Sequence, residues 1–300
     1  MSHLSTNSKG IIYMLLSALL FSMMDAFVKI LAQDFGAVEI LFFRSFVMVL
    51  LIMLTKDAIK KPIKKKGGLT PLILRSVAGA IAMLALFYNI KTLPLGVAIT
   101  FLKSMPIYAV FLAWLFLKER ASFGVILSAI VGFLGIIVIS DPFGSSISPF
   151  NIFMGVISGL GAAIAMTALR SSREYFSNNF IVLTFGLVTT ILALIVFALP
   201  EFFVDNSFIF PNLPQFGFII LMGICGTIAQ VFLTKSYASA PAAIVSPFTY
   251  TEILFSIILG IALGDRLLQS NEAMGIVLII ISGFLVALPI FIKDFRKKHD

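Results

Sequence analysis

The sequence predicts an all-α polytopic membrane protein with ten transmembrane helices arranged as two inverted five-helix repeats. Three observations lead to this prediction: the composition, the number of long apolar segments, and a similarity between the two halves of the chain. Of the 300 residues, 60% are hydrophobic and only 12% are charged. Because soluble domains carry roughly a quarter charged residues, a chain this apolar is expected to lie in lipid.

Ten segments are long and apolar enough to be transmembrane helices, which need about 20 mainly apolar residues. They are 10–31, 37–54, 71–91, 95–117, 122–140, 150–169, 179–199, 215–234, 242–263 and 273–292. The first is too long for the apolar region of a signal peptide and lacks a small-residue cleavage site, so we interpret it as a spanning helix. The connections are short and leave no room for a soluble domain.

The positive charges collect in alternate connections and at the ends of the chain. With a cytoplasmic N-terminus, sixteen Lys and Arg residues lie inside and only two, Lys91 and Arg266, lie outside. The inside residues are Lys9, Lys56, Lys60, Lys61, Lys64, Lys65, Lys66, Lys118, Arg120, Arg170, Arg173, Lys235, Lys293, Arg296, Lys297 and Lys298. This asymmetry predicts a multi-pass protein of the cell (inner) membrane with both termini cytoplasmic. The same asymmetry accounts for the net charge of +8, because the positive residues orient the protein in the lipid bilayer. We therefore expect the bilayer, and no nucleic acid, as a partner.

The two halves of the chain resemble each other. Gly124–Gly132 reads GVILSAIVG and Gly275–Gly283 reads GIVLIIISG, and each follows an apolar segment that ends in a short charged group, LKER or LGDR. We therefore expect one five-helix repeat over 10–140 and a second over 150–292. Because five is an odd number, the second repeat is expected to be inverted, an arrangement typical of secondary transporters with a midplane site.

Four stretches carry a resemblance to a known family. They are FSMMDAFVKIL (Phe21–Leu31), EILFFRS (Glu39–Ser45), the long run Leu93–Arg120, and SPFTYTEILFSIILGIALGD (Ser246–Asp265). The sequence resembles the drug/metabolite transporter superfamily, specifically its EamA-type bacterial members, over nearly the whole chain. The resemblance implies ten helices in two inverted repeats, a central cavity and alternating access, and it does not specify the substrate.

Two ionisable residues fall deep inside predicted helices, where a charge costs roughly 2.5–3.5 kcal/mol on insertion scales. Lys103 lies in segment 95–117 and Glu252 in segment 242–263. When the two repeats are aligned, these two segments are equivalent, and the aligned positions of the two charges differ by less than one helical turn. We expect both side chains to face the interior. They either form a structural pair that locks two helices or contact the substrate during transport, and we favour contact with the substrate.

Other charges at membrane depth are Asp25, Lys29, Glu39, Arg44 and Arg75. Arg44 is a candidate for binding a carboxylate or phosphate through two parallel hydrogen bonds, and structural pairing with Glu39 or Asp25 is the alternative. Asp25 and Lys29 are four residues apart and could pair along one helix face. We expect Arg75 to snorkel to the inner interface and Glu39 to be solvated near the outer one.

Two prolines and two tyrosines complete the candidate site. Pro106 and Pro247 lie inside segments 95–117 and 242–263. Each removes a backbone donor and frees a carbonyl one turn earlier, which membrane helices tolerate where the carbonyl lines a cavity. Tyr108 and Tyr250 could contribute hydroxyl groups to the substrate site.

The sequence carries no signature of an enzyme, a cofactor or a metal site, and a lone Cys225 cannot form an internal disulfide. Transport energy would then come from a coupling proton or an exchanged solute. We expect a secondary transporter of a small polar metabolite, such as an amino acid or derivative. The alternative is an aromatic or nucleoside-like solute, such as a vitamin or an S-adenosylmethionine-like compound. A membrane enzyme or a structural protein is disfavoured, and the sequence predicts no oligomeric state.

Overall fold

A computed structural model describes residues 6–55, 67–105, 107–109, 112, 123–140, 147–198, 208–240 and 245–296. Within these ranges the chain forms ten α-helices, one 3-10 helix and no strand. They are α1 (Thr6–Leu31), α2 (Ala37–Met53), α3 (Leu69–Thr92), α4 (Leu95–Lys103), α6 (Phe123–Ser140), α7 (Pro149–Ser172), α8 (Asn178–Phe197), α9 (Leu213–Ser239), η2 (Ser246–Tyr250), α11 (Thr251–Ala262) and α12 (Ser270–Arg296). The predicted all-α class is confirmed.

Every predicted spanning segment contains one of these helices. Five helical stretches are long and apolar enough to cross a membrane by length and composition alone: Ser8–Leu31, Leu69–Thr92, Pro149–Ser172, Asn178–Phe197 and Leu213–Ser239. Others, including Phe248–Ala262 and Ser270–Leu285, are apolar but shorter within the described residues. Most of the second half of predicted segment 95–117 lies outside those residues.

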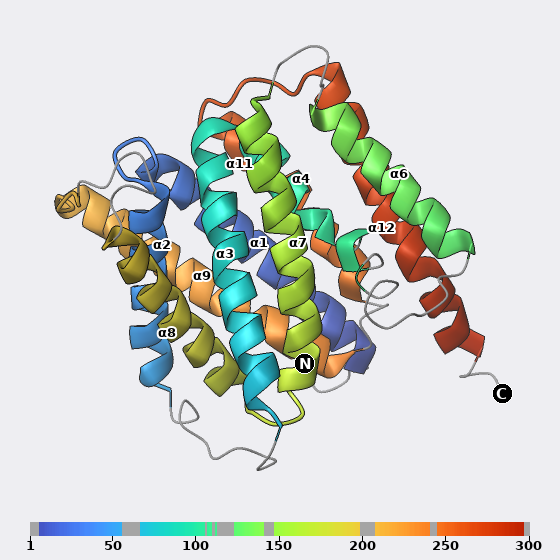
Figure 1. Cartoon of the computed structure of the whole chain (residues 1–300), viewed down its shortest axis with the longest axis horizontal. Coiled ribbons are helices and arrows are strands. Elements are labelled where there is room, and N and C mark those ends of the chain that lie inside the picture. Colours follow the sequence, from blue (N-terminus) through green and yellow to red (C-terminus); the bar gives the residue numbers. More distant parts are fainter. Residues whose placement is uncertain are drawn as a thin grey trace.

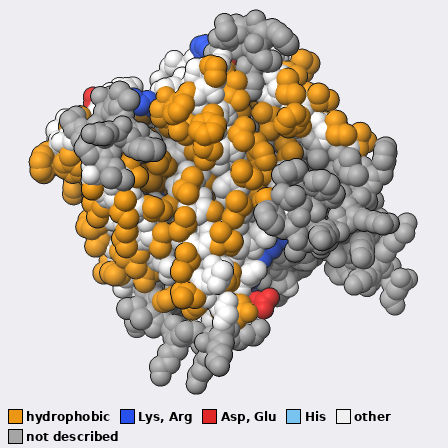
Figure 2. Space-filling view, viewed as in Figure 1, with side chains coloured by type: hydrophobic (Ala, Val, Ile, Leu, Met, Phe, Trp, Pro, Cys, Tyr) orange, Lys and Arg blue, Asp and Glu red, His pale blue; other side chains and the backbone are white. Residues whose placement is uncertain are grey.

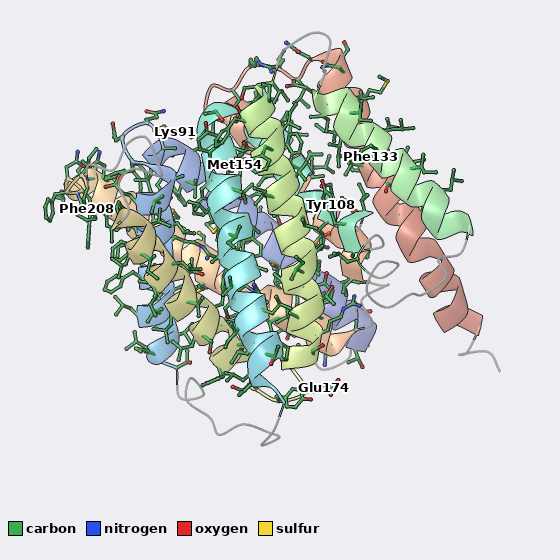
Figure 3. The ribbon with its side chains drawn as sticks, viewed as in Figure 1. Lys91, Tyr108, Phe133, Met154, Glu174 and Phe208 are labelled. Carbon is green, nitrogen blue, oxygen red and sulfur yellow. The ribbon has the colours of Figure 1, made fainter. Side chains whose placement is uncertain are left out.

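The outer surface of the bundle is apolar, as a lipid-facing surface must be. Figure 2 shows a broad hydrophobic face over the helices, with the visible charged side chains near its margins. Large side chains such as Phe133, Ile191 and Ile258 are 53–64% exposed, and Figure 3 shows Phe133 pointing away from the bundle. Lys91 and Glu174 lie at opposite ends of the bundle in the same view.

Four helix pairs make the main contacts: α1 with α9, α3 with α7, α2 with α8, and α6 with α12. The α6–α12 pair forms one side of the molecule in Figure 1. Small residues let these helices approach closely. A Cβ atom on Gly275 of α12 would lie 2.4 Å from the Ile139 side chain of α6. A Cβ atom on Gly155 of α7 would lie 2.4 Å from the Phe101 ring of α4. Both glycines therefore set the spacing between neighbouring helices.

The first turn of α1 and the last turns of α12 lie at the same end of the bundle (Figure 1). An even number of crossings requires this arrangement. The side of the membrane on which that end lies stays a prediction from the positive charges.

The expectation that Glu39 is solvated is wrong. The residue is only 2% exposed, because its carboxylate satisfies backbone donors at the start of α2. Oε2 accepts a hydrogen bond from the Gly36 amide at 3.0 Å, and Oε1 accepts one from the Ile209 amide at 2.7 Å. A carboxylate at a helix N-terminus also interacts favourably with the helix dipole. The hydrogen bond from Ile209 therefore connects Glu39 of α2 to the segment that precedes α9.

We predict that Glu39→Ala lowers the free energy of unfolding by about 1–3 kcal/mol, because it leaves the partly buried amides of Gly36 and Ile209 without their acceptor. Thermal denaturation of the purified protein in detergent measures this as a lower Tm. Asp34→Ala is the matched control, since Asp34 is an exposed acid whose carboxylate accepts a hydrogen bond from Gln215 Nε2. Equal Tm values for the two variants would contradict the anchoring role of Glu39.

Candidate functional site

The candidate site lies where two helix ends meet inside the bundle. α4 ends at Lys103, and Ser104 caps it with an α-region backbone conformation. On the opposite side, the 3-10 helix η2 precedes α11, which begins at Thr251. Pro247 lies in the first turn of η2, so the predicted irregularity near this proline is present. Pro106 lies outside the described residues.

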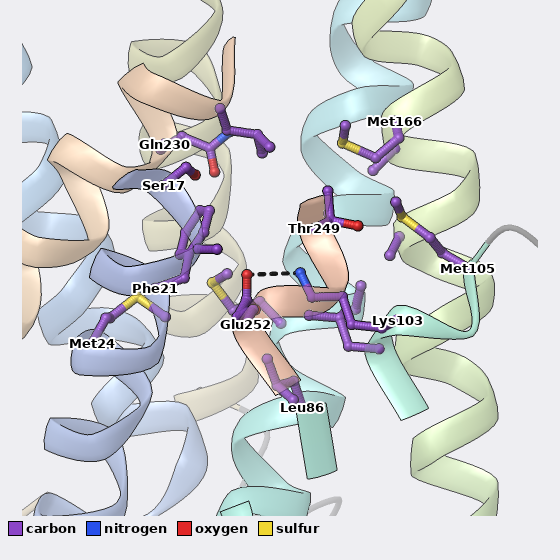
Figure 4. A pocket seen from close by; sticks show the side chains of 18 of the residues that line it. Ser17, Phe21, Met24, Leu86, Lys103, Met105, Met166, Gln230, Thr249 and Glu252 are labelled. Carbon is purple, nitrogen blue, oxygen red and sulfur yellow. Dashed lines mark hydrogen bonds and ion pairs between the residues drawn. The ribbon is translucent and has the colours of Figure 1, made fainter. Parts of the chain in front are cut away.

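Lys103 and Glu252 form a buried ion pair between these two helix ends. Lys103 Nζ donates to Glu252 Oε2 at 2.8 Å, and the two side chains are only 11% and 4% exposed. Lys103 is in the last turn of α4 and Glu252 is in the first turn of α11. Each charge therefore interacts favourably with the dipole of its own helix. The predicted interior location of both residues is confirmed (Figure 4).

A cavity of about 110 Å³ lies beside this pair. Its described lining combines charged groups with a soft apolar wall, as Figure 4 shows for Met24, Met105 and Met166. Methionine side chains are flexible and polarisable, so such a wall adapts to different ligand shapes. Gln230 and Thr249 add polar atoms. The cavity can therefore hold a small polar molecule between fixed charges.

The cavity lies toward one end of the bundle. Its lining comes from Met14 to Asp25 of α1, from Ala162 to Met166 of α7 and from Gln230 to Tyr237 of α9. The residues from α1 lie around the middle of that helix, whereas those from α7 and α9 lie in the second halves of their helices, toward the end of the bundle where α7 and α9 end.

The opposite end of the bundle is held together by a polar cluster. Lys29 of α1 pairs with Asp265, which follows α11, and Lys29 Nζ also donates to the Leu93 carbonyl at 2.9 Å. Asp265 Oδ2 accepts a hydrogen bond from the Leu95 amide at 2.8 Å. α1, α4 and α11 are thus joined beyond the cavity. Lys29 therefore pairs with Asp265 and not with Asp25.

Asp25 is 1% exposed and lines the cavity. Its Oδ1 atom has no hydrogen-bond partner among the described residues. It lies within electrostatic range of Lys103, Glu252 and Arg44. The structure therefore brings three of the predicted site residues, Asp25, Lys103 and Glu252, to one cavity.

The two buried arginines lie differently from what the sequence suggested. Arg44 is fully buried, but it lies outside the described lining of the cavity, where its Nε contacts Met24 Sδ at 3.4 Å. The expectation that Arg75 snorkels is wrong, because Arg75 is 4% exposed and lines the cavity. The short distance from Arg75 to the end of its helix suggested an interfacial residue. In the structure, Arg75 points into the bundle, where α3 packs against α7 and α8.

The two tyrosines lie outside the described lining of the cavity. Tyr108 packs against α7, where a Cβ on Gly159 would lie 2.6 Å from its ring (Figure 3). Tyr250 is 5% exposed, packs over Gly283 of α12 and stacks on Phe284 with ring centroids 6.3 Å apart. A substrate role for either tyrosine stays a prediction.

Comparison with known proteins matches this architecture to one family. The model of the EamA-like transporter family matches residues 8–141 and again residues 150–288. An uncharacterized transporter of Helicobacter pylori is 38% identical over 290 residues, which cover 96% of this chain and 97% of that protein. The pseudopaline exporter CntI of Pseudomonas aeruginosa is 30% identical over 82% of this chain and 84% of its own length. An S-adenosylmethionine uptake transporter of Rickettsia conorii is 24% identical over 99% and 98%.

The family match covers both halves of the chain, and the helices surround a cavity lined in part by charged residues. The chain therefore belongs to the EamA-like transporter family of the drug/metabolite transporter superfamily, and it is a polytopic membrane transporter.

Proposed function

We propose that this transporter is a secondary active carrier of a small polar metabolite, such as an amino acid or a derivative, which it moves by alternating access through the central cavity. The observation that carries the proposal is the Lys103–Glu252 pair at the meeting point of α4 and α11. Two opposite charges beside one cavity provide a polar environment that suits a small zwitterion.

The size of the cavity supports a small solute. Sites for drug-sized ligands measure roughly 300–1,000 Å³, and this cavity measures about 110 Å³. An aromatic or nucleoside-like solute would require a considerable expansion. The charges support a polar solute, because Asp25, Arg75, Lys103 and Glu252 all line the cavity.

The helix contacts support two inverted repeats over 10–140 and 150–292. If the first helix of one repeat corresponds to the first of the other, α1 matches α7 and α3 matches α9. The contact of α1 with α9 is then the counterpart of the contact of α3 with α7. The pairs α2 with α8 and α6 with α12 join equivalent helices. Such symmetry is the basis of alternating access in transporters with inverted repeats.

The positions of the cavity and of the Lys29–Asp265 cluster fit one state of this cycle. If the protein lies in the inner membrane with both termini in the cytoplasm, the part of the cavity lined by the second halves of α7 and α9 lies on the cytoplasmic side. The Lys29–Asp265 cluster then closes the outer side. Transition to the other state would separate α1 from the α4–α11 pair. The energy for transport would come from a coupling proton or from an exchanged solute. Asp25 is a candidate carrier for a coupling proton, because one of its carboxylate oxygens has no hydrogen-bond partner among the described residues.

A nucleoside-like solute is the second candidate function. It is favoured by the similarity to a protein named as an S-adenosylmethionine uptake transporter, which extends over 99% of this chain. Adaptable methionines in the cavity wall would allow the site to widen around a larger ligand.

Lys103→Ala should abolish transport while the protein still reaches the membrane, because the variant removes one of the charges that contacts the solute. Uptake of a panel of radiolabelled amino acids into proteoliposomes measures the flux. Lys91→Ala is the matched control, since Lys91 is an exposed lysine at the end of α3. Wild-type flux in the Lys103 variant would refute the role of Lys103.

The double variant Lys103→Met/Glu252→Gln separates a transport role from a structural one. Removing one partner of a buried pair costs about 3–5 kcal/mol, whereas removing both is often tolerated. We expect the double variant to recover the Tm that Lys103→Ala loses, yet to remain inactive in the same uptake assay. Recovery of both Tm and flux would show that the pair only locks α4 to α11.

Competition between solutes distinguishes the two candidate functions. We expect unlabelled amino acids to inhibit uptake into wild-type proteoliposomes, and S-adenosylmethionine and aromatic vitamins to inhibit it weakly, because the cavity is small. Inhibition constants for the two groups of compounds provide the measurement. Stronger inhibition by S-adenosylmethionine than by every amino acid would favour the nucleoside-like alternative.

A further inference from the structure

Arg75 is a buried cation whose charge is not matched within the described chain. The residue lies on α3 and is 4% exposed, and its Nε has no hydrogen-bond partner among the described residues. Its guanidinium carbon lies 4.4 Å from the centroid of the Phe185 ring of α8. A cation over an aromatic ring is stabilised by the ring's quadrupole, but the ring offers no acceptor for the N–H groups. Arg75 therefore retains donors for a ligand.

Arg44 lies against the same ring from α2. Its guanidinium carbon is 5.6 Å from the Phe185 centroid. Arg44 is 0% exposed, and both Nη1 and Nη2 lack hydrogen-bond partners in the described part of the chain. Arg44 and Arg75 are within electrostatic range of each other. Two like charges beside one ring raise the positive potential at this wall of the cavity.

The charge balance around the cavity leaves room for one negative charge. Among the described residues that line the cavity or lie behind its Phe185 wall, Arg44, Arg75 and Lys103 carry three positive charges. Asp25 and Glu252 carry two negative charges when ionised, which leaves an excess of one positive charge. Lys103 and Glu252 already neutralise each other at 2.8 Å. A buried charge is stable only when it is paired, and a bound anion would supply the missing partner at Arg75.

A glycine gives the guanidinium its position. Gly79 lies one turn after Arg75 on α3 and lines the cavity. A Cβ atom at Gly79 would lie 2.4 Å from Arg75 Nη1 and 3.0 Å from the Phe185 ring. The absence of a side chain at Gly79 lets the guanidinium lie between α3 and the Phe185 ring at the cavity wall.

We propose that Arg75 is the docking group for a carboxylate of the transported solute, that Phe185 and Gly79 hold its guanidinium in place, and that Arg44 reinforces the positive potential. The inference rests on the proposed transport function and narrows its substrate class to carboxylates. The planar guanidinium matches the two oxygens of a carboxylate. A single excess charge suits a carboxylate better than a phosphate monoester, which carries about −1.5 to −2 at neutral pH.

A thermal-shift experiment on the purified full-length protein in detergent tests the assignment. The probes are L-amino acids, each paired with its amide, together with acetate, succinate, inorganic phosphate and chloride at constant ionic strength. Because a ligand that binds only the folded state raises Tm, we expect one or more amino acids to raise the Tm of the wild type. The matching amides lack the carboxylate and should fail to do so.

Three variants locate the effect. Arg75→Gln should abolish the shift by the amino acid. Gly79→Ala displaces the guanidinium and should weaken binding roughly tenfold, as expected when a two-point ionic contact becomes a one-point contact. Arg170→Gln, at an exposed arginine in the last turn of α7, should bind like the wild type. Without ligand, Arg75→Gln should match or exceed the wild-type Tm, since it removes an unpaired buried charge.

Several results would overturn the proposal. The first is that no carboxylate raises the Tm of the wild type, and the second is that the amides raise it as much as the acids do. The third is that phosphate raises it more than any carboxylate. The fourth is that Arg75→Gln keeps the ligand-induced shift or has a lower Tm than the wild type without ligand. Flux in proteoliposomes separates this failure from failure of the proposed function. Wild-type transport of amides would refute the carboxylate site alone, whereas binding without flux of the bound amino acid would refute the transport of that solute alone.

Discussion

The ion pair between Lys103 and Glu252 is the interaction on which the rest of this structure depends. A charge in the middle of a bilayer is costly, so the chain keeps both charges at helix ends, where the dipoles of α4 and α11 stabilise them. Those ends exist because α4 ends at Lys103 and because the 3-10 helix η2 precedes the first turn of α11. This arrangement places two charges beside a cavity, while the outer face stays apolar.

A second feature is an excess of positive charge among the described residues near the cavity, which the proposed ligand would balance. The pair at α4 and α11 is neutral, while the two arginines beside Phe185 exceed the charge of Asp25. This excess is the basis of the proposed carboxylate site at Arg75. A polar cluster around Lys29 and Asp265 joins helices at the other end of the bundle, and in the proposed mechanism it would close that side to the solute.

Much of the fold and part of the site could be predicted from the sequence. Apolar length defines helices regardless of their partners, and charges deep in two equivalent segments had to face inward. The remaining features depend on helix rotation and distant contacts. Arg75 was misjudged because position along α3 does not reveal the direction of its side chain. Glu39 and Lys29 were misjudged because their partners, near Ile209 and at Asp265, are about 170 or more residues away in the sequence.

The central claim is that a water-accessible cavity lies among these helices, and cysteine labelling tests it most directly. In a Cys225→Ser background, Ala165→Cys places a thiol in the cavity wall and Ile191→Cys places one on the lipid-facing side of α8. Thiosulfonate reagents require the thiolate, which forms in water. The account predicts that a charged reagent modifies the cysteine at 165 and leaves the one at 191 unmodified. Modification of 191 with protection of 165 would contradict it.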